Sequence, residues 1–190
     1  MQNKSFKFNL SDDGYYELLK FLPYFRKVNI FGIIGILVIW LLLFLYWNNA
    51  FQEYASSFPD AMFAGIFALF LSLIVLLFLF LLFWFRISTF LKKSARNLKE
   101  KYQPLNGEEY SIAFDQEIMS FLLGNGQHKI VVGKNLEVIS TSKHLLFYHG
   151  DGKSQKKFYI PKNGNEKHQE NIRYIANYLE KETDVQFKEK

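Results

Sequence analysis

Histidine is the residue type of this chain best suited both to metal binding and to proton transfer near neutral pH, and the sequence has four of them. A metal site on a helix typically places two histidines four residues apart, as in the HExxH motif. None of the four has such a partner; they are His128, His144, His149 and His168. We interpret them as surface and strand residues and predict neither a metal nor a cofactor. Cysteine is absent, which excludes disulfides, thiolate ligands and cysteine nucleophiles.

Two glycine-rich segments, residues 124–126 and 149–153, look at first like phosphate-binding loops. In such loops the glycines follow a strand and open a helix, so that backbone N–H groups point at the phosphate. Neither segment leads into a helical pattern. We therefore predict a hairpin turn at each of them.

Four carboxylates in the C-terminal half offer the residue types of a paired acid and base. They are Glu108, Glu109, Asp115 and Glu117. They flank a short alternating segment, and nothing in the sequence marks a cleft around them, so we interpret them as a solvated strand edge. The residues that could carry chemistry thus favour a chain that is not an enzyme.

The longest elements that the sequence predicts are two apolar runs, residues 30–47 and 61–85. Neither run contains Asp, Glu, Lys, Arg or His. As helices they would be about 27 and 37 Å long, against a bilayer hydrocarbon core about 30 Å thick. The alternative is a pair of buried helices in a soluble core, but soluble helices of this length carry a polar face. The runs predict a transmembrane hairpin.

The charges that flank the runs predict the orientation of this hairpin. Three basic residues lie at 20–27 and six at 86–101, whereas the loop at 48–60 has two acidic residues and no basic one. Because Lys and Arg accumulate on the cytoplasmic side of short flanking segments, we expect both termini in the cytoplasm.

The formal net charge of +5 is confined to the first half of the chain. Residues 1–101 hold 11 basic and 6 acidic side chains, whereas residues 102–190 hold 12 of each. A basic excess beside the membrane suits anionic lipids. The balanced C-terminal half makes nucleic acid an unexpected partner.

Small residues recur along one side of the second run and would allow another helix to approach closely. This small-residue stripe consists of Ala61, Gly65, Ala68 and Ser72. We expect Leu41, Leu45 and their neighbours to pack into it, and Leu and Phe side chains of the second run to cover Gly32 and Gly35. The competing use of the stripe is homo-oligomerisation or the docking of another membrane protein.

Two further sets of residues are candidate partner contacts. The outer-loop aromatics are Phe51, Tyr54 and Phe58. Their other interpretation is anchoring at the level of the lipid headgroups. The basic-aromatic set is Lys153, Lys156, Lys157, Phe158 and Tyr159, which would face the inner leaflet or a partner, or else form a solvated loop.

The periodicity of the remaining segments predicts a mixed α+β organisation. Alternation predicts a strand at 5–10, and Ser11 then caps a helix at about 13–27 that Pro23 kinks or ends. Further strands are predicted at 110–115, 118–123, 129–132, 136–140, 144–149 and 158–160. A change to helical spacing predicts a final helix at 166–182.

We divide the chain into four parts on these grounds. They are a cytoplasmic strand and amphipathic helix at 1–27, the transmembrane hairpin at 28–85 with spans 30–47 and 61–85, a basic juxtamembrane helix at 86–103, and a cytoplasmic β domain with a C-terminal helix at 104–190.

Three short motifs carry a resemblance to a known family. They are Phe6-Lys7-Phe8-Asn9-Leu10-Ser11-Asp12-Asp13, Leu145-Leu146-Phe147-Tyr148 and Ile160-Pro161-Lys162. Over its whole length the chain resembles the YcxB-like family of bacterial membrane proteins. The resemblance implies a multi-pass protein of the bacterial cytoplasmic (inner) membrane. It also implies that residues 104–190 form an antiparallel, barrel-like domain of the pleckstrin-homology (PH) type, closed by the C-terminal helix. The resemblance implies no catalytic residues. It also suggests a role in immunity, since some members of the family serve as immunity proteins beside secreted bacterial toxins.

Two functions from different classes follow as hypotheses. The first is an immunity protein that neutralises a membrane-active toxin through the hairpin or its outer loop. The second is an adaptor or sensor that binds a protein or lipid headgroup at the inner leaflet. A channel or transporter is disfavoured, since both runs lack the ionisable groups and helix breaks that transport usually needs.

Overall fold

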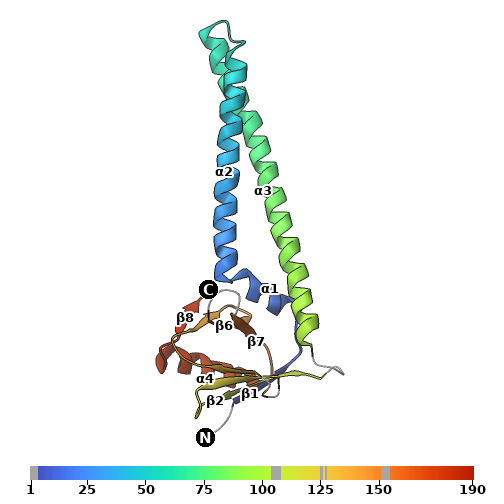
Figure 1. The fold of residues 1–190 in the computed structure, drawn as a ribbon, viewed down its shortest axis with the longest axis vertical. Coiled ribbons are helices and arrows are strands. Elements are labelled where there is room, and N and C mark those ends of the chain that lie inside the picture. Colours follow the sequence, from blue (N-terminus) through green and yellow to red (C-terminus); the bar gives the residue numbers. More distant parts are fainter. Residues whose placement is uncertain (1–3, 104–107, 125, 127, 151–154) are drawn as a thin grey trace. The chain divides into compact units, whose positions relative to one another are not determined.

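The computed structural model describes residues 4–103, 108–124, 126, 128–150 and 155–190. The chain is α+β, with two long apolar helices and two sheets. It divides into two compact units (Figure 1). The β unit comprises Met1–Leu22 and Lys92–Lys190, and the helical unit comprises Pro23–Leu91.

The helical unit contains α2 (Pro23–Gln52) and the larger part of α3 (Phe58–Tyr102). Both helices are long and apolar enough to cross a membrane. They extend beyond the predicted spans and leave only residues 53–57 between them. Ser57 precedes α3 and its hydroxyl accepts a hydrogen bond from the backbone N–H of Asp60, which satisfies one donor of the helix N-terminus, and donates one to the Asp60 carboxylate.

Pro23 was predicted to kink or end the first helix; that helix ends before it, and Pro23 begins the next helix. The first helix, α1 (Asp12–Lys20), ends three residues before it, and α2 starts at Pro23 itself. Proline is well tolerated at the first helical position because the N–H that it lacks would have no partner there.

The β unit contains two four-stranded sheets. The first has the order β1 (Lys4–Phe8), β2 (Tyr110–Asp115), β3 (Ser120–Leu123) and β4 (His128–Val131), all antiparallel. The second has the order β7 (Lys156–Pro161), β6 (His144–His149), β5 (Leu136–Ser140) and β8 (Gln186–Glu189). In the second sheet β8 runs parallel to β5, and the other pairs are antiparallel.

Aromatic rings fill the space between the two sheets. Phe121 of β3 contacts Phe147 of β6 and Phe158 of β7, with ring centroids 4.9 and 5.3 Å apart. Phe147 and Phe158 are stacked on each other at 4.4 Å. All three side chains are buried, so this cluster is the centre of the core.

The helix α4 (Glu166–Lys181) packs on the same inner face of the first sheet. Its Tyr178 contacts Phe114 of β2, which itself contacts Phe121, and its His168 lies edge-on to Phe6 of β1. Asn165 caps the helix by accepting a hydrogen bond from the His168 backbone N–H. The predicted C-terminal helix is confirmed, and it covers the apolar edge of the core.

The sheets are not closed into a barrel, and that part of the predicted fold class is wrong. In the described residues no strand of the first sheet pairs with a strand of the second. The chain instead crosses from β4 to β5 and starts a separate sheet. Alternating burial determines which face of a strand points inward but not which strands are neighbours, so barrel closure was not readable from the pattern.

Candidate functional site

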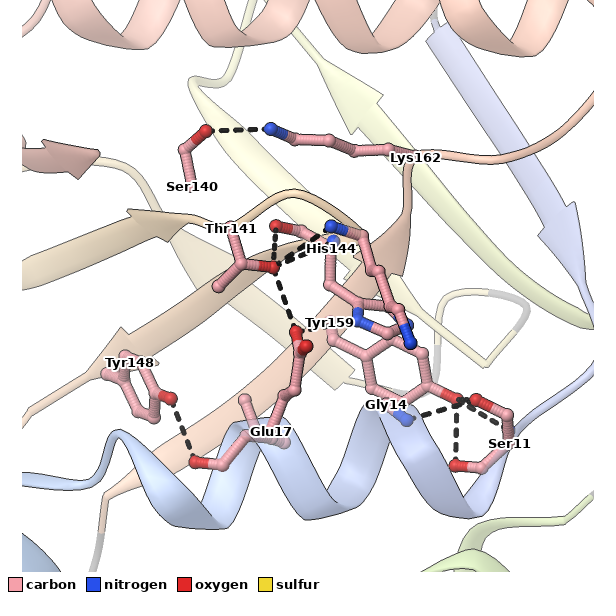
Figure 2. Close-up of polar contacts among 11 residues, drawn as sticks. Ser11, Gly14, Glu17, Ser140, Thr141, His144, Tyr148, Tyr159 and Lys162 are labelled. Atoms are coloured by element: carbon pink, nitrogen blue, oxygen red, sulfur yellow. Dashed lines mark hydrogen bonds and ion pairs between the residues drawn. The ribbon is translucent and has the colours of Figure 1, made fainter. Parts of the chain in front are cut away.

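The most highly organised polar region of the β unit is the seam between α1 and the second sheet (Figure 2). Even-numbered residues of β6, His144 and Tyr148, reach α1, whereas Phe147 points the other way into the core. Tyr159 of β7 shares the α1-facing side. The strand β6 is therefore buried on both faces, which explains its almost unbroken run of buried side chains.

Glu17 of α1 is the centre of one half of this seam. Its Oε2 lies 2.8 Å from His144 Nδ1 and accepts a hydrogen bond of 2.8 Å from Thr141 Oγ1. Thr141 also accepts from the backbone N–H of His144, which closes the turn between β5 and β6. An ionised carboxylate only accepts, so Nδ1 is the donor and the histidine orientation is set by Glu17.

Ser11 and Tyr159 form the other half of the seam. The Tyr159 hydroxyl accepts a 2.6 Å hydrogen bond from the Ser11 backbone N–H, and the Ser11 side chain accepts one of 3.0 Å from Gly14 N–H as the N-cap of α1. Gly14 faces the Tyr159 ring so closely that a Cβ atom would overlap it. Only glycine lets the helix approach the sheet this far.

Tyr148 holds the C-terminal end of α1. Its hydroxyl donates a 2.8 Å hydrogen bond to the Leu18 carbonyl, one of the carbonyls in the last turn that have no partner within the helix. Burial raises the pKa of Tyr148, and likewise those of Tyr15 and Tyr159. These phenols are therefore held as neutral hydrogen-bonding groups.

The seam has the residue types of a catalytic triad but not its geometry. The Thr141 hydroxyl is hydrogen-bonded to Glu17 and to the backbone of its own turn, and His144 points its Nδ1 at the same carboxylate. A nucleophile would have to face the other ring nitrogen of the histidine. The arrangement instead fastens α1 to the sheet.

No metal centre is formed within the part of the chain that the structure describes, where no three His, Cys, Asp or Glu side chains come together. His144 and His168 are buried and make structural hydrogen bonds to Glu17 and to the Pro161 carbonyl. The carboxylate of Asp115 accepts hydrogen bonds from two backbone N–H groups of the following turn, those of Glu117 and Ile118.

The small-residue stripe lies against α2 of the same chain. Ala68 and Ser72 are fully buried, and Ser72 accepts a 3.2 Å hydrogen bond from Trp40 Nε1. Gln52 donates a 2.9 Å hydrogen bond to the Ala61 carbonyl, and the position of a Cβ on Gly65 would lie 3.5 Å from Asn48 Oδ1. The residues of α2 that contact the stripe are thus Trp40, Asn48 and Gln52.

The expected packing of leucines into the stripe differs from this. Leu41 and Leu45 are about half exposed, whereas Ala68 and Ser72 of the stripe are fully buried. Of the two glycines, Gly32 is covered by the Phe83 ring as expected, whereas Gly35 has no neighbour within 4 Å of a Cβ position. The predicted packing considered only apolar residues of α2, whereas the residues that contact the stripe include the polar side chains of Asn48 and Gln52.

The three outer-loop aromatics differ in their surroundings. Phe51 contacts Phe67 of α3, with ring centroids 5.4 Å apart. Tyr54 and Phe58 are 87% and 83% exposed. These two rings are therefore available to another molecule or to a membrane surface.

The basic-aromatic set is not a single surface. Phe158 and Tyr159 are buried in the core and the seam, because both faces of β7 are covered. Lys156 is exposed and Lys157 half-buried, and burial lowers the pKa of Lys157. Lys153 lies outside the described residues. Burial removes both rings from the predicted set, which leaves the two described lysines.

Sequence reasoning missed Glu17, Thr141 and Tyr148 as members of one polar seam. The only sequence feature that pointed to the seam was the nearly continuous apolar run at 144–149. Such a run indicates a strand that is buried on both faces and is therefore packed against another element on each side. The helix that provides this cover lies more than 120 residues away in the chain, a separation over which no periodicity gives information.

No protein-family model, curated protein or solved structure matches this chain.

Proposed function

We propose that the chain is a non-enzymatic, membrane-anchored binding protein. The observation that carries this proposal is the surface of the helical unit. Large apolar side chains cover α2 and α3 on the sides turned away from each other; examples are Phe31, Leu42, Phe63, Phe70 and Leu77, each more than half exposed. An apolar surface of this extent is stable only against lipid or another apolar partner.

The composition of the β unit supports the proposed topology. It contains residues from both sides of the helical unit, because β1 and α1 precede α2, whereas β2 to β8 follow α3. Both flanks must therefore lie on the same side of any membrane that the two helices cross. Together with the basic flanks, this favours both termini in the cytoplasm of a bacterium.

Among membrane-anchored binders, we propose an immunity protein that neutralises a membrane-active bacterial toxin. The support is the family resemblance and the exposed rings of Tyr54 and Phe58 beside the short loop between α2 and α3. Aromatic side chains supply much of the affinity at protein interfaces. A toxin acting from outside or within the bilayer would meet this end of the helices.

The experiment is co-expression with the product of the adjacent gene in a susceptible bacterium. We expect the full chain to rescue growth and to co-purify with that product in detergent. The double variant Tyr54→Ser/Phe58→Ser should lose rescue at unchanged membrane content. The double variant Lys156→Gln/Lys157→Gln, at the β unit, is the matched control and should retain it.

An adaptor at the inner leaflet is the second candidate, and the two surface lysines of β7 favour it. It predicts the reverse behaviour: the lysine variant loses partner binding and the aromatic variant keeps it. An adjacent gene product that is neither toxic nor bound would exclude the immunity function. For this candidate we propose that the β unit is a PH-type domain. The two facing sheets and the helix α4 support this proposal.

A further inference from the structure

A cleft of about 760 Å³ opens in the β unit beside the α1 seam. Its walls come from three connections between elements: the one from β1 to α1, the turn between β5 and β6, and the one from β7 to α4. The lining includes Lys7, Lys143, Lys162, His144 and Asp13. Three lysines against one acid make the cleft basic, although the C-terminal half of the chain is neutral overall.

The lysine ammonium groups are largely uncommitted. Among the described residues, no hydrogen bond or ion pair engages the ammonium of Lys7 or Lys143, and that of Lys162 donates one hydrogen bond to Ser140. Three lysines beside a single carboxylate leave an excess of positive charge, and an anion between them would relieve their mutual repulsion.

His144 is a buried residue of the lining, with 5% of its surface exposed. Its Nδ1 is engaged by Glu17, and its edge packs on the Tyr159 ring at 5.2 Å between centroids. Among the described residues Nε2 has no hydrogen-bond partner, and with Nδ1 as the donor to Glu17 it donates to an anion only when the ring is doubly protonated. The contacts with Glu17 and Tyr159 fix the orientation of this ring in the wall of the cleft.

The positions of the lysines are also set by backbone bonds. Lys162 N–H donates a 2.7 Å hydrogen bond to the Lys143 carbonyl, which joins the β5–β6 turn to the end of β7. Thr141 closes the same turn. The cleft therefore needs little rearrangement to receive a ligand, which lowers the cost of binding.

We propose that this cleft binds a phosphate-bearing ligand. No arginine lines the cleft, and lysine binds phosphate as a compact point charge. Separate lysine charges suit a phosphomonoester, with its greater charge and three terminal oxygens. The volume leaves room for the organic group that carries the phosphate. The inference goes beyond the proposed function and does not depend on it, since every lining residue belongs to the β unit.

The test uses the full chain in nanodiscs of neutral lipid, with inorganic phosphate and glycerol 3-phosphate as probes in isothermal titration. We expect saturable binding of glycerol 3-phosphate, weakened at least about fivefold by Lys143→Gln and by Lys7→Gln. Lys167→Gln, which changes an exposed lysine of α4 outside the cleft, should leave it unchanged.

A second arm distinguishes a lipid headgroup from a soluble ligand. If phosphatidic acid in the nanodisc competes with glycerol 3-phosphate, the source is a lipid; if it does not, the ligand is soluble. The proposal is overturned if neither probe shows saturable binding. It is also overturned if the Lys7→Gln and Lys143→Gln variants bind glycerol 3-phosphate as tightly as the Lys167→Gln variant does. The growth-rescue assay above is unaffected by either result, so the two proposals fail separately.

Discussion

At the scale of single residues, Gly14 shows how one missing side chain sets the position of a whole helix. Its backbone N–H is bound by the N-cap residue Ser11, and the Tyr159 ring occupies the space that a Cβ would need. Tyr159 in turn accepts from Ser11 N–H. Three residues from opposite ends of the chain are thereby packed into one contact.

Gly14→Ala should therefore destabilise the seam. The added methyl group forces the ring or the helix to move, at about 1–3 kcal/mol, which exceeds the gain of about 0.5–1 kcal/mol in helix propensity. Hydrogen–deuterium exchange of the α1 amides should become faster. Gly133→Ala is the control, because its Cβ would have no neighbour within 4 Å. Equal exchange rates in the two variants would contradict the packing described.

At the scale of elements, the sequence predicted those defined by local pattern. The strands at 136–140 and 144–149 begin and end where predicted, and the hydrophobic spacing of α4 gave its limits within one residue. The strand β8 was missed, since it is short, polar and mostly exposed. Its parallel pairing with β5 depends on where α4 delivers the chain, which no local pattern records.

The seam was predictable only in part, for the same reason. Ser11 was read correctly as a helix cap, but the positions of Glu17 and Tyr148 follow from long-range packing. Likewise, the small-residue stripe predicted close helix contact, whereas the identity of the opposing residues did not follow from it. Spacing determines which residues share a face, and the tertiary fold determines what that face meets.

Two glycines of α2 give a matched test of the helix pair. Gly32→Ala brings a methyl group into the Phe83 ring and should lower the stability of the helical unit by about 1–3 kcal/mol. Gly35→Ala meets open space and should leave stability equal or raise it by up to about 1 kcal/mol. The measurement is unfolding in denaturing detergent, followed by tryptophan fluorescence.

That signal reports on the helical unit alone. The three tryptophans are Trp40, Trp47 and Trp84, all within Pro23–Leu91. If both alanine variants unfold at the same detergent concentration, the contact between Gly32 and Phe83 does not contribute as described.

At the scale of the whole molecule, the two units should respond differently to alkali. In the β unit burial raises the pKa of Tyr110 to about 12, and those of Tyr15, Tyr148 and Tyr159 are raised as well. An unfolded tyrosine has a pKa of about 10. Above that pH the folded state holds more protons than the unfolded state, so stability is full below about pH 10 and falls as pH rises further.

We expect the near-ultraviolet circular dichroism of the β unit to be lost in a cooperative step above about pH 10, together with a step in tyrosinate absorbance. Absorbance at the tyrosinate band and circular dichroism should change together, because the buried phenols ionise only when the unit unfolds. A gradual, non-cooperative ionisation with retained circular dichroism would show that the buried phenols do not control the stability of this unit.

The pairing of β1 with β2 also constrains the order in which the chain can fold. Lys4 is opposite Phe114 in the register, and the seam needs residues up to Tyr159. At about 5–20 residues per second, the first strand is synthesised several seconds before its partner exists. Both apolar helices are synthesised in that interval. The first sheet therefore cannot form until both apolar helices have been synthesised, and β1 lacks its pairing partner for more than half of translation.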